Sequence, residues 1–140
     1  MRKEKNNNFY IILIKPQLEE NVGAVARAML NFEFQNLRIV KNKWKPNRKS
    51  LSMSAGADII IRNAQIYKSL EEATKDLHYL YATTNRKRSL NLKVVNLKKG
   101  INEIVQIKNK KIGIVFGPER SGINNDDISL CDKIINIHLN

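Results

Sequence analysis

The run Phe9-Tyr-Ile-Ile-Leu-Ile14, followed by Glu20 to Phe32 (ENVGAVARAMLNF), decides the fold. The first segment is continuously apolar, which is typical of a strand buried on both faces of a parallel sheet. A strand with one solvent-exposed face would alternate apolar and polar residues. The second segment has an apolar stripe at helical spacing, formed by Val22, Val25, Ala26, Met29 and Leu30. A buried strand that leads into an amphipathic helix predicts an α/β domain.

The same pattern continues along the chain. Further strands are predicted at Leu37 to Val40, Asp58 to Ile61, His78 to Ala82, Lys111 to Phe116 and Lys133 to Ile137. Further helices are predicted at Ser69 to Leu77, at Leu97 to Ile107 and from Asn125 onward. Strands that alternate with helices predict a three-layer α/β domain with a mostly parallel sheet, whose ligands bind at the carboxyl ends of the strands.

Length and charge narrow the function class. A chain of 140 residues is expected to form one domain. Its 25 Lys+Arg and 13 Asp+Glu give a net charge of +12, which favours an anionic partner such as nucleic acid. The charge is uneven: 23 basic minus 9 acidic residues give +14 over residues 1–111, and 2 minus 4 give −2 over residues 112–140. Lys, Asn and Ile supply 53 residues, so an AT-rich genome is a second explanation of the lysines.

Few residues suit metals or redox chemistry. The single cysteine, Cys131, excludes an internal disulfide and fits a reducing, cytoplasmic location. His78 and His138 have no cysteine or acidic neighbours at ligand spacing, so we expect structural histidines and no metal site. No apolar run approaches the roughly 18 to 20 residues of a membrane span. Residues 1–8 are expected to form a flexible basic arm before a domain that covers residues 9–140.

Two segments carry the strongest candidate chemistry. In Gly113-Ile-Val-Phe-Gly-Pro-Glu-Arg-Ser-Gly122, a strand enters a loop bounded by Gly117 and Gly122 that holds one carboxylate, Glu119. In Asn21-Val-Gly-Ala-Val-Ala-Arg27, Arg27 stands among small and apolar neighbours, where its guanidinium either pairs with a buried carboxylate or binds a phosphate. The alternatives are an ordinary strand-to-helix turn and a surface arginine.

Two basic loops follow predicted strands. Lys41, Lys43, Lys45 and Arg48 surround Trp44, which could stack on a base or lie half-buried in a solvated loop. The second loop, Thr83 to Lys93, contains Arg86, Lys87 and Arg88 in a row. Both loops are candidates for phosphate contacts with RNA.

Together these segments resemble one family. Asn21-Val-Gly-Ala-Val-Ala-Arg-Ala-Met29, Phe116-Gly-Pro-Glu-Arg-Ser-Gly-Ile123, Asn125-Asp-Asp-Ile128 and Cys131 look like the first two motifs of the SpoU/TrmH RNA methyltransferases of the SPOUT superfamily. Pro16, the stretch Leu51 to Ala57 (LSMSAGA) and Thr83-Thr-Asn-Arg86 look most like the TrmJ subgroup, which methylates ribose in the tRNA anticodon loop.

The resemblance implies a knotted α/β fold, a homodimer and S-adenosylmethionine as the methyl donor to a ribose 2′-hydroxyl of cytidine or uridine. It implies that Asn21 and Arg27 face the ribose and that Glu119 supports the site. It also implies that the cofactor pocket is lined by Thr83, Thr84, Asn85, Gly117 and Ile137. Because the arginine pKa lies above about 12, we assign Arg27 first to the phosphate beside the target ribose and only second to proton removal.

The third family motif, which follows the last strand and forms the knot, does not occur in these 140 residues. Ser89-Leu-Asn-Leu92 has similar letters in another position, and we treat it as coincidence. The sequence therefore predicts an incomplete SPOUT domain, truncated before the knot. It leaves two functions open: a methyltransferase, whose activity in this chain is in question, and a non-catalytic RNA-binding remnant.

Overall fold

A computed structural model describes residues 8–84 and 93–136 of the chain. Within these residues the strands are β1 (Phe9–Ile14), β2 (Asn36–Val40), β3 (Gln65–Tyr67), β4 (Tyr79–Thr84), β5 (Lys93–Asn96), β6 (Ile112–Phe116) and β7 (Lys133–Asn136). The helices are α1 (Glu19–Asn31), α2 (Arg48–Ser52), α3 (Asp58–Arg62), α4 (Leu70–Thr74), α5 (Leu97–Gln106) and α6 (Asn125–Ile128). The predicted flexibility of residues 1–8 falls almost wholly outside the described part of the chain.

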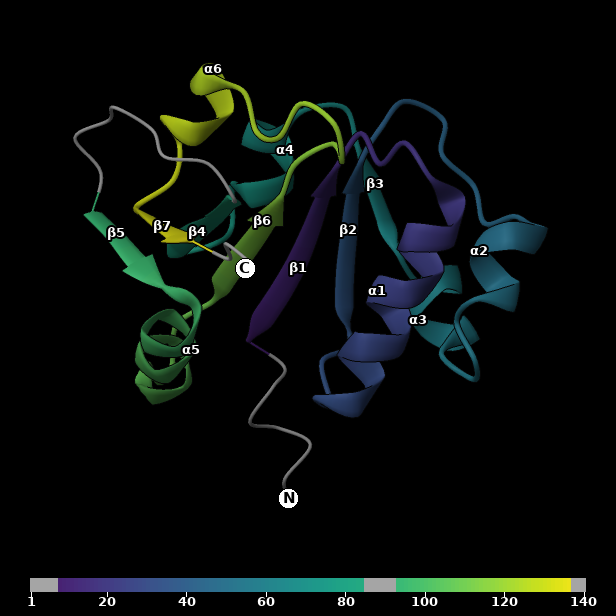
Figure 1. Cartoon of the computed structure of the whole chain (residues 1–140), viewed down its shortest axis with the longest axis horizontal. Coiled ribbons are helices and arrows are strands. Elements are labelled where there is room, and N and C mark those ends of the chain that lie inside the picture. The colour runs from purple at the N-terminus through teal and green to yellow at the C-terminus, as the bar shows by residue number, and fades with distance from the viewer. Residues whose placement is uncertain (1–7, 85–92, 137–140) are drawn as a thin grey trace.

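The strands form one sheet in the order β3-β2-β1-β6-β4-β7-β5, and every pair is parallel. Helices cover both faces (Figure 1). On one face, Ile11 and Leu13 of β1 pack under α1 and α3, while Phe9 of the same strand belongs to a cluster with Ile104 of α5. The other face is covered by α4 and α6. The predicted three-layer α/β architecture with a parallel sheet is confirmed.

The best sequence signals lie where they were predicted. Phe9–Ile14 forms the predicted strand, and α1 buries Val22, Ala26 and Met29 against the sheet. Ser69 accepts a hydrogen bond from the Glu72 backbone amide and caps α4. The last helix starts at Asn125 as predicted, and the preceding residue, Asn124, caps it.

The strand predicted at Asp58 to Ile61 is wrong, because these residues form α3. A short apolar run does not distinguish a strand from one buried helical turn. Here Ala55 and Gly56 adopt positive φ angles of 49° and 96° and turn the chain back, and Ile60 and Ile61 pack on the α1 side of the sheet while Ile59 stays exposed.

Candidate active site

The candidate site lies where the strand order of the sheet reverses. From β1 the chain continues to β2 on one side, and from its neighbour β6 it continues to β7 on the other. In open α/β sheets, ligands bind outside the carboxyl ends of the strands at such a switch point. The connection that follows β1, residues 15–18, and the loop that follows β6, residues 117–124, both start at this edge.

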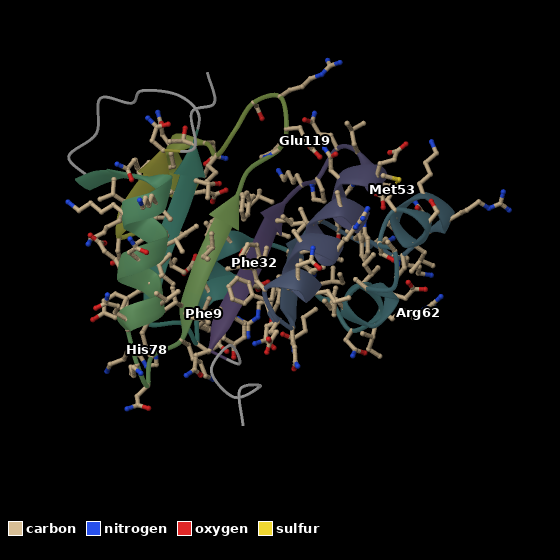
Figure 2. All side chains as sticks on the ribbon, turned by 60° about the horizontal axis from the view of Figure 1, so that its bottom comes forward. Phe9, Phe32, Met53, Arg62, His78 and Glu119 are labelled. Atoms are coloured by element: carbon tan, nitrogen blue, oxygen red, sulfur yellow. The ribbon has the colours of Figure 1, made fainter. Side chains whose placement is uncertain are left out.

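Glu119 joins these two segments. Its Oε1 accepts a hydrogen bond from the Gln17 backbone amide at 2.7 Å, and its Oε2 accepts from the Leu18 amide at 3.3 Å and from Asn21 Nδ2 at 3.0 Å. A further hydrogen bond links the same segments: the Gln17 side-chain Oε1 accepts from the Arg120 backbone amide at 2.8 Å. Figure 2 shows Glu119 above the start of α1. The structure thus brings the two predicted motifs, about 100 residues apart in sequence, into direct contact.

These contacts set the charge of Glu119. Partial burial alone would raise its pKa, but the hydrogen bonds from Gln17, from its own backbone amide, from Asn21 and from Leu18 outweigh burial and hold the pKa below its ordinary value. Glu119 is therefore a carboxylate at neutral pH, and a weak base. It is suited to orienting Asn21 and the start of α1 rather than to taking a proton.

Gly117 allows the loop after β6 to curl tightly. A Cβ at Gly117 would lie 2.4 Å from the Ile123 backbone nitrogen and 2.5 Å from the Gly122 carbonyl carbon, closer than real Cβ contacts. Gly122 has a φ of 71° and donates its amide hydrogen to the Pro118 carbonyl at 2.8 Å. Both glycines are therefore required by the backbone conformation of this loop. The loop in turn places Glu119 over the carboxyl end of β1.

Asn21 and Arg27 occupy different parts of α1. Asn21 lies in the first turn and binds Glu119, whereas Arg27 comes six residues later, a rise of about 9 Å along the helix. The Arg27 side chain is exposed, and among the described residues it makes no hydrogen bond or ion pair. Arg27 is therefore not paired with Glu119 or another described carboxylate. A phosphate ligand and a plain surface arginine both fit this exposed position.

Three of the predicted cofactor residues gather at neighbouring strand ends. Because Ala82 pairs with Val115, Thr84 and Gly117 each lie two residues further along β4 and β6. Thr84 in turn pairs with Asn136 at the end of β7. The Thr83 side chain is buried, and its hydroxyl donates to the Val115 carbonyl at 2.8 Å, so it braces β4 against β6. Asn85 and Ile137 lie outside the described residues.

The residues of the first basic loop differ in how far they are exposed. Lys43, Lys45 and Arg48 are exposed, but Lys41 is half-buried and its Nζ donates to the Pro16 carbonyl at 3.1 Å. Arg48 is already the first residue of α2, since Asn47 and Ser50 form a capping box. The second basic group, Arg86, Lys87 and Arg88, lies outside the described residues.

The interpretation of Trp44 as a base-stacking residue is wrong. Its side chain is only 7% exposed and packs among the residues beneath α1 and α3. The indole Nε1 donates to both carboxylate oxygens of Glu19, at 3.1 and 3.2 Å. A ring enclosed in this way has no open face for a base, and the half-buried alternative also understates its burial.

His78 and Cys131 are structural. His78 Nδ1 accepts the Lys111 backbone amide at 2.8 Å, just before β4 and β6 begin to pair. Cys131 is buried under α6, and burial raises the pKa of its thiol to about 12, so it is no nucleophile. The described residues contain no group of three or more histidine, cysteine or acidic side chains that could hold a metal ion, and none of the described helices could cross a membrane. His138 lies outside the described range.

Comparison with known proteins identifies the family of this site. The model of the SpoU rRNA methylase family matches residues 8–140. The chain belongs to the SpoU methylase family. Both the Asn21 segment and the Glu119 loop fall within the match, so the resemblance seen in the sequence is confirmed.

Relatives within this SpoU family are TrmJ proteins. The chain is 37% identical over 130 residues to the tRNA (cytidine-2′-O-)-methyltransferase TrmJ of Methanocaldococcus jannaschii, covering 91% of this chain and 56% of that protein. It is 32% identical over 134 residues to the tRNA (cytidine/uridine-2′-O-)-methyltransferase TrmJ of Salmonella typhimurium, covering 95% and 55%. The chain thus spans about half the length of these relatives.

Solved structures of SpoU-family proteins have a fold similar to that of this chain. The crystal structure of TrmJ from Z. mobilis ZM4 superposes with a TM-score of 0.85 at 39% identity, covering 94% of this chain and 59% of that one. The SpoU methyltransferase AviRb from Streptomyces viridochromogenes, solved in complex with AdoMet, gives a TM-score of 0.69, with 96% and 50% covered. At 16% identity, that second likeness concerns the fold alone.

The sequence did not point to Gln17 or Glu19 of this candidate site, and it assigned Lys41 to RNA phosphates and not to an internal contact. Gln17 and Lys41 tie the β1–α1 connection to its neighbours, and Glu19 receives the Trp44 indole. All three follow a strand, as residues after β1 or β2, so the rule that ligands bind at strand ends could have marked them. Their partners could not have been found, because each contact spans 25 residues or more of sequence.

Proposed function

We propose that this chain carries the methyl-transfer activity of its SpoU relatives, using S-adenosylmethionine to methylate a ribose 2′-hydroxyl of cytidine or uridine in tRNA. The observation that carries the proposal is the Glu119 carboxylate, which holds Asn21 and the β1–α1 connection at the switch point of the sheet. The printed names of the TrmJ relatives supply the substrate class.

The strand ends of β4, β6 and β7 fit a nucleoside cofactor. They combine apolar surroundings, such as buried Ile123, with backbone polar groups around Gly117 and the Thr84 side chain, the mixture that small-molecule pockets usually show. Gly117 lets the loop beside them curl tightly, because a Cβ there would lie 2.4 Å from the Ile123 backbone nitrogen. We assign this edge, with Thr83, Thr84 and Gly117 and with Asn85 and Ile137 following β4 and β7, to S-adenosylmethionine, which supplies an electrophilic methyl group.

On the RNA side, Asn21 and Arg27 have separate tasks. Among the described residues the Asn21 amide binds only Glu119, through Nδ2, so its carbonyl oxygen remains available to accept a hydrogen bond from the ribose hydroxyl. The exposed Arg27 guanidinium binds the adjacent phosphate with its planar set of donors. The transfer would form a carbon–oxygen bond as the carbon–sulfur bond of the cofactor breaks, and the hydroxyl proton would leave to solvent. It depends mainly on alignment of the two reactants, which these two anchors provide.

We assign two groups of basic residues to tRNA phosphates. They are the exposed Lys43, Lys45 and Arg48 of the first basic loop, and Arg86, Lys87 and Arg88 of the second. The lone, buried Cys131 is consistent with a cytoplasmic location, where tRNA is found and thiols stay reduced.

Calorimetric titration distinguishes the enzyme from an RNA-binding remnant. The proposal predicts micromolar binding of S-adenosylmethionine by the full chain, and tRNA binding that weakens steeply between about 50 and 200 mM salt. Salt-sensitive tRNA binding without cofactor binding would instead identify a non-catalytic RNA-binding protein.

We further propose a homodimer. Leu30, near the end of α1, and Phe32, directly after the helix, are large apolar side chains that are 45% and 65% exposed. The Phe32 ring lies 6.0 Å from that of Phe34, which in turn lies 5.2 Å from the ring of Phe9 on β1; Figure 2 labels Phe32 and Phe9. Light scattering should give about twice the 16.1 kDa chain mass, and Phe32→Glu should lower it toward the monomer. A monomeric wild-type chain would contradict the dimer.

A further inference from the structure

The β1–α1 connection is held from two sides. On one side, the loop after β6 binds it through Glu119 and the Arg120 amide. On the other, the segment after β2 binds it through Lys41 Nζ, which donates to the Pro16 carbonyl, and through Trp44, which donates to Glu19. The basic segment Lys41 to Arg48 is therefore attached at Pro16 and Glu19, which flank the two residues that share Glu119 with Asn21.

Trp44 is the buried anchor of this basic segment. Its neighbours Lys43 and Lys45 are exposed, while its own side chain is 7% exposed. Lys43 adopts a φ of 58°, so the chain turns sharply just before Trp44 enters the core. The indole N–H has a carboxylate as its acceptor, and hydrogen bonds to charged groups are stronger than those between neutral groups.

The far end of the segment is fixed as well. Asn47 and Ser50 cap α2 reciprocally. A Cβ at Gly23 of α1 would lie 2.3 Å from the Ser50 carbonyl oxygen and 2.7 Å from Met53 Cβ, so α1 and α2 pack with almost no space between them. With both ends fixed against α1, the exposed charges between them have a defined place beside the first turn of that helix.

We propose that Trp44 and Glu19 form a positioning pair, which holds Lys43, Lys45 and Arg48 beside the start of α1 so that these three cations bind phosphates of the RNA whose ribose reaches Asn21. This inference rests on the proposed function. Trp44 touches neither RNA nor cofactor, and it acts only through the charged segment that it anchors.

A double-mutant cycle tests the pair in the full chain. Trp44→Phe removes the indole N–H and keeps an aromatic ring, and it should weaken tRNA binding about tenfold. In a background that carries Lys43→Ala, Lys45→Ala and Arg48→Ala, the same change should weaken binding less than about twofold, because the charges it positions are gone. The affinity for S-adenosylmethionine should stay the same in all four proteins.

Glu19 provides a second test that leaves the core intact. Glu19→Gln keeps an oxygen acceptor for the indole and should retain most of the tRNA affinity, whereas Glu19→Ala should match Trp44→Phe. If Trp44→Phe does not unfold cooperatively, and so is not properly folded, the tRNA affinities of the two Glu19 variants test the pair instead. The proposal is overturned if Glu19→Ala and Trp44→Phe bind tRNA like the wild type, or if Trp44→Phe weakens binding equally in both backgrounds. Absence of tRNA binding by the wild-type chain would instead overturn the RNA part of the proposed function, and this inference with it.

Discussion

Two arginines show how differently one side chain is used in this domain. Arg38 of β2 is 5% exposed, and its guanidinium donates to Asp76 at 2.7 and 3.0 Å, to the Ala73 carbonyl at 2.8 Å and to Gln65 at 3.2 Å. It also lies 4.4 Å from the centre of the Tyr10 ring. Arg27 of α1 is exposed and, within the described residues, makes no such contact.

The difference shows what to look for in a functional cation. Arg38 lies within the sheet, and all its strong contacts are internal, so it stabilises the packing of α4 on β2. Arg27 lies on a helix that starts at the switch point, and no described residue occupies its donors, which leaves them available to the phosphate that we propose. Both were equally basic in the sequence, and only the placement of partners separates a structural arginine from one assigned to RNA.

The largest expected effect is on activity at Arg27. Arg27→Ala should lower methyl transfer to tRNA by about 10², because it removes the donor that holds the phosphate beside the target ribose and so misplaces the hydroxyl. The melting temperature and the affinity for S-adenosylmethionine should stay at wild-type values. A radiolabelled methyl-transfer assay measures the activity, and calorimetry measures the melting temperature and the affinity for the cofactor. Equal loss of activity and cofactor binding would show that Arg27 is structural, and the contrast with Arg38 would be lost.

The second prediction concerns the contribution of Arg38 to the stability of the fold. Arg38→Ala should lower the free energy of unfolding by about 3 kcal/mol, the lower end for a broken buried ion pair, because Asp76 is half-exposed and can be solvated. Arg38→Lys, which keeps the charge but loses the two-pronged contact, should recover part of that loss. Urea unfolding followed by circular dichroism measures both variants. A wild-type unfolding curve for Arg38→Ala would contradict the assignment.

A smaller effect is expected at Glu119. Glu119→Ala removes the acceptor for the Gln17, Leu18 and Asn21 donors and should lower the free energy of unfolding by about 1 kcal/mol, since the site is largely exposed. Activity should fall more than stability, because Asn21 is no longer oriented. Glu119→Gln, which keeps one oxygen, serves as the matched control. Full activity in Glu119→Ala would remove this carboxylate from the site.

The smallest effect is a pH dependence. The Arg38 hydrogen bond lowers the pKa of Asp76 below its ordinary 3.8, and this outweighs the opposing effect of burial. A carboxylate whose pKa is lower in the folded state stabilises the fold above the unfolded pKa and loses that contribution as the pH falls through the folded value. Asp76→Asn should therefore unfold with a weaker pH dependence than the wild type below about pH 4. Identical acid profiles would show that the pair with Arg38 contributes nothing.

Much of this structure could be predicted, because the decisive signals are local. The run Phe9 to Ile14 and the stripe on α1 need only their own residues to be interpreted, and both were confirmed. The edge strands β3 and β5 have three and four residues, too short for a pattern, and were missed. The helix α3 was mistaken for a strand, since Ile59, Ile60 and Ile61 favour a strand unless the preceding turn is known.

The candidate site was predictable as a set of residues and not as a set of contacts. Asn21 and Glu119 were both selected, and the structure joins them. The pairing considered for Arg27 with a buried carboxylate does not occur among the described residues: Glu119 is bound near the start of α1, while Arg27 lies almost two turns further along the helix. The role of Trp44 was missed because its partner Glu19 lies on another element, and no local pattern links them.

The most direct measurement of the central claim is the position of a transferred methyl group. The protein is incubated with tRNA and methyl-labelled S-adenosylmethionine, and the RNA is digested to nucleosides that are separated by mass. We predict label in 2′-O-methylcytidine or 2′-O-methyluridine, and a loss of that label in Arg27→Ala but not in Arg38→Lys. Label on a base, or no label at all from a chain that binds both cofactor and tRNA, would contradict the account.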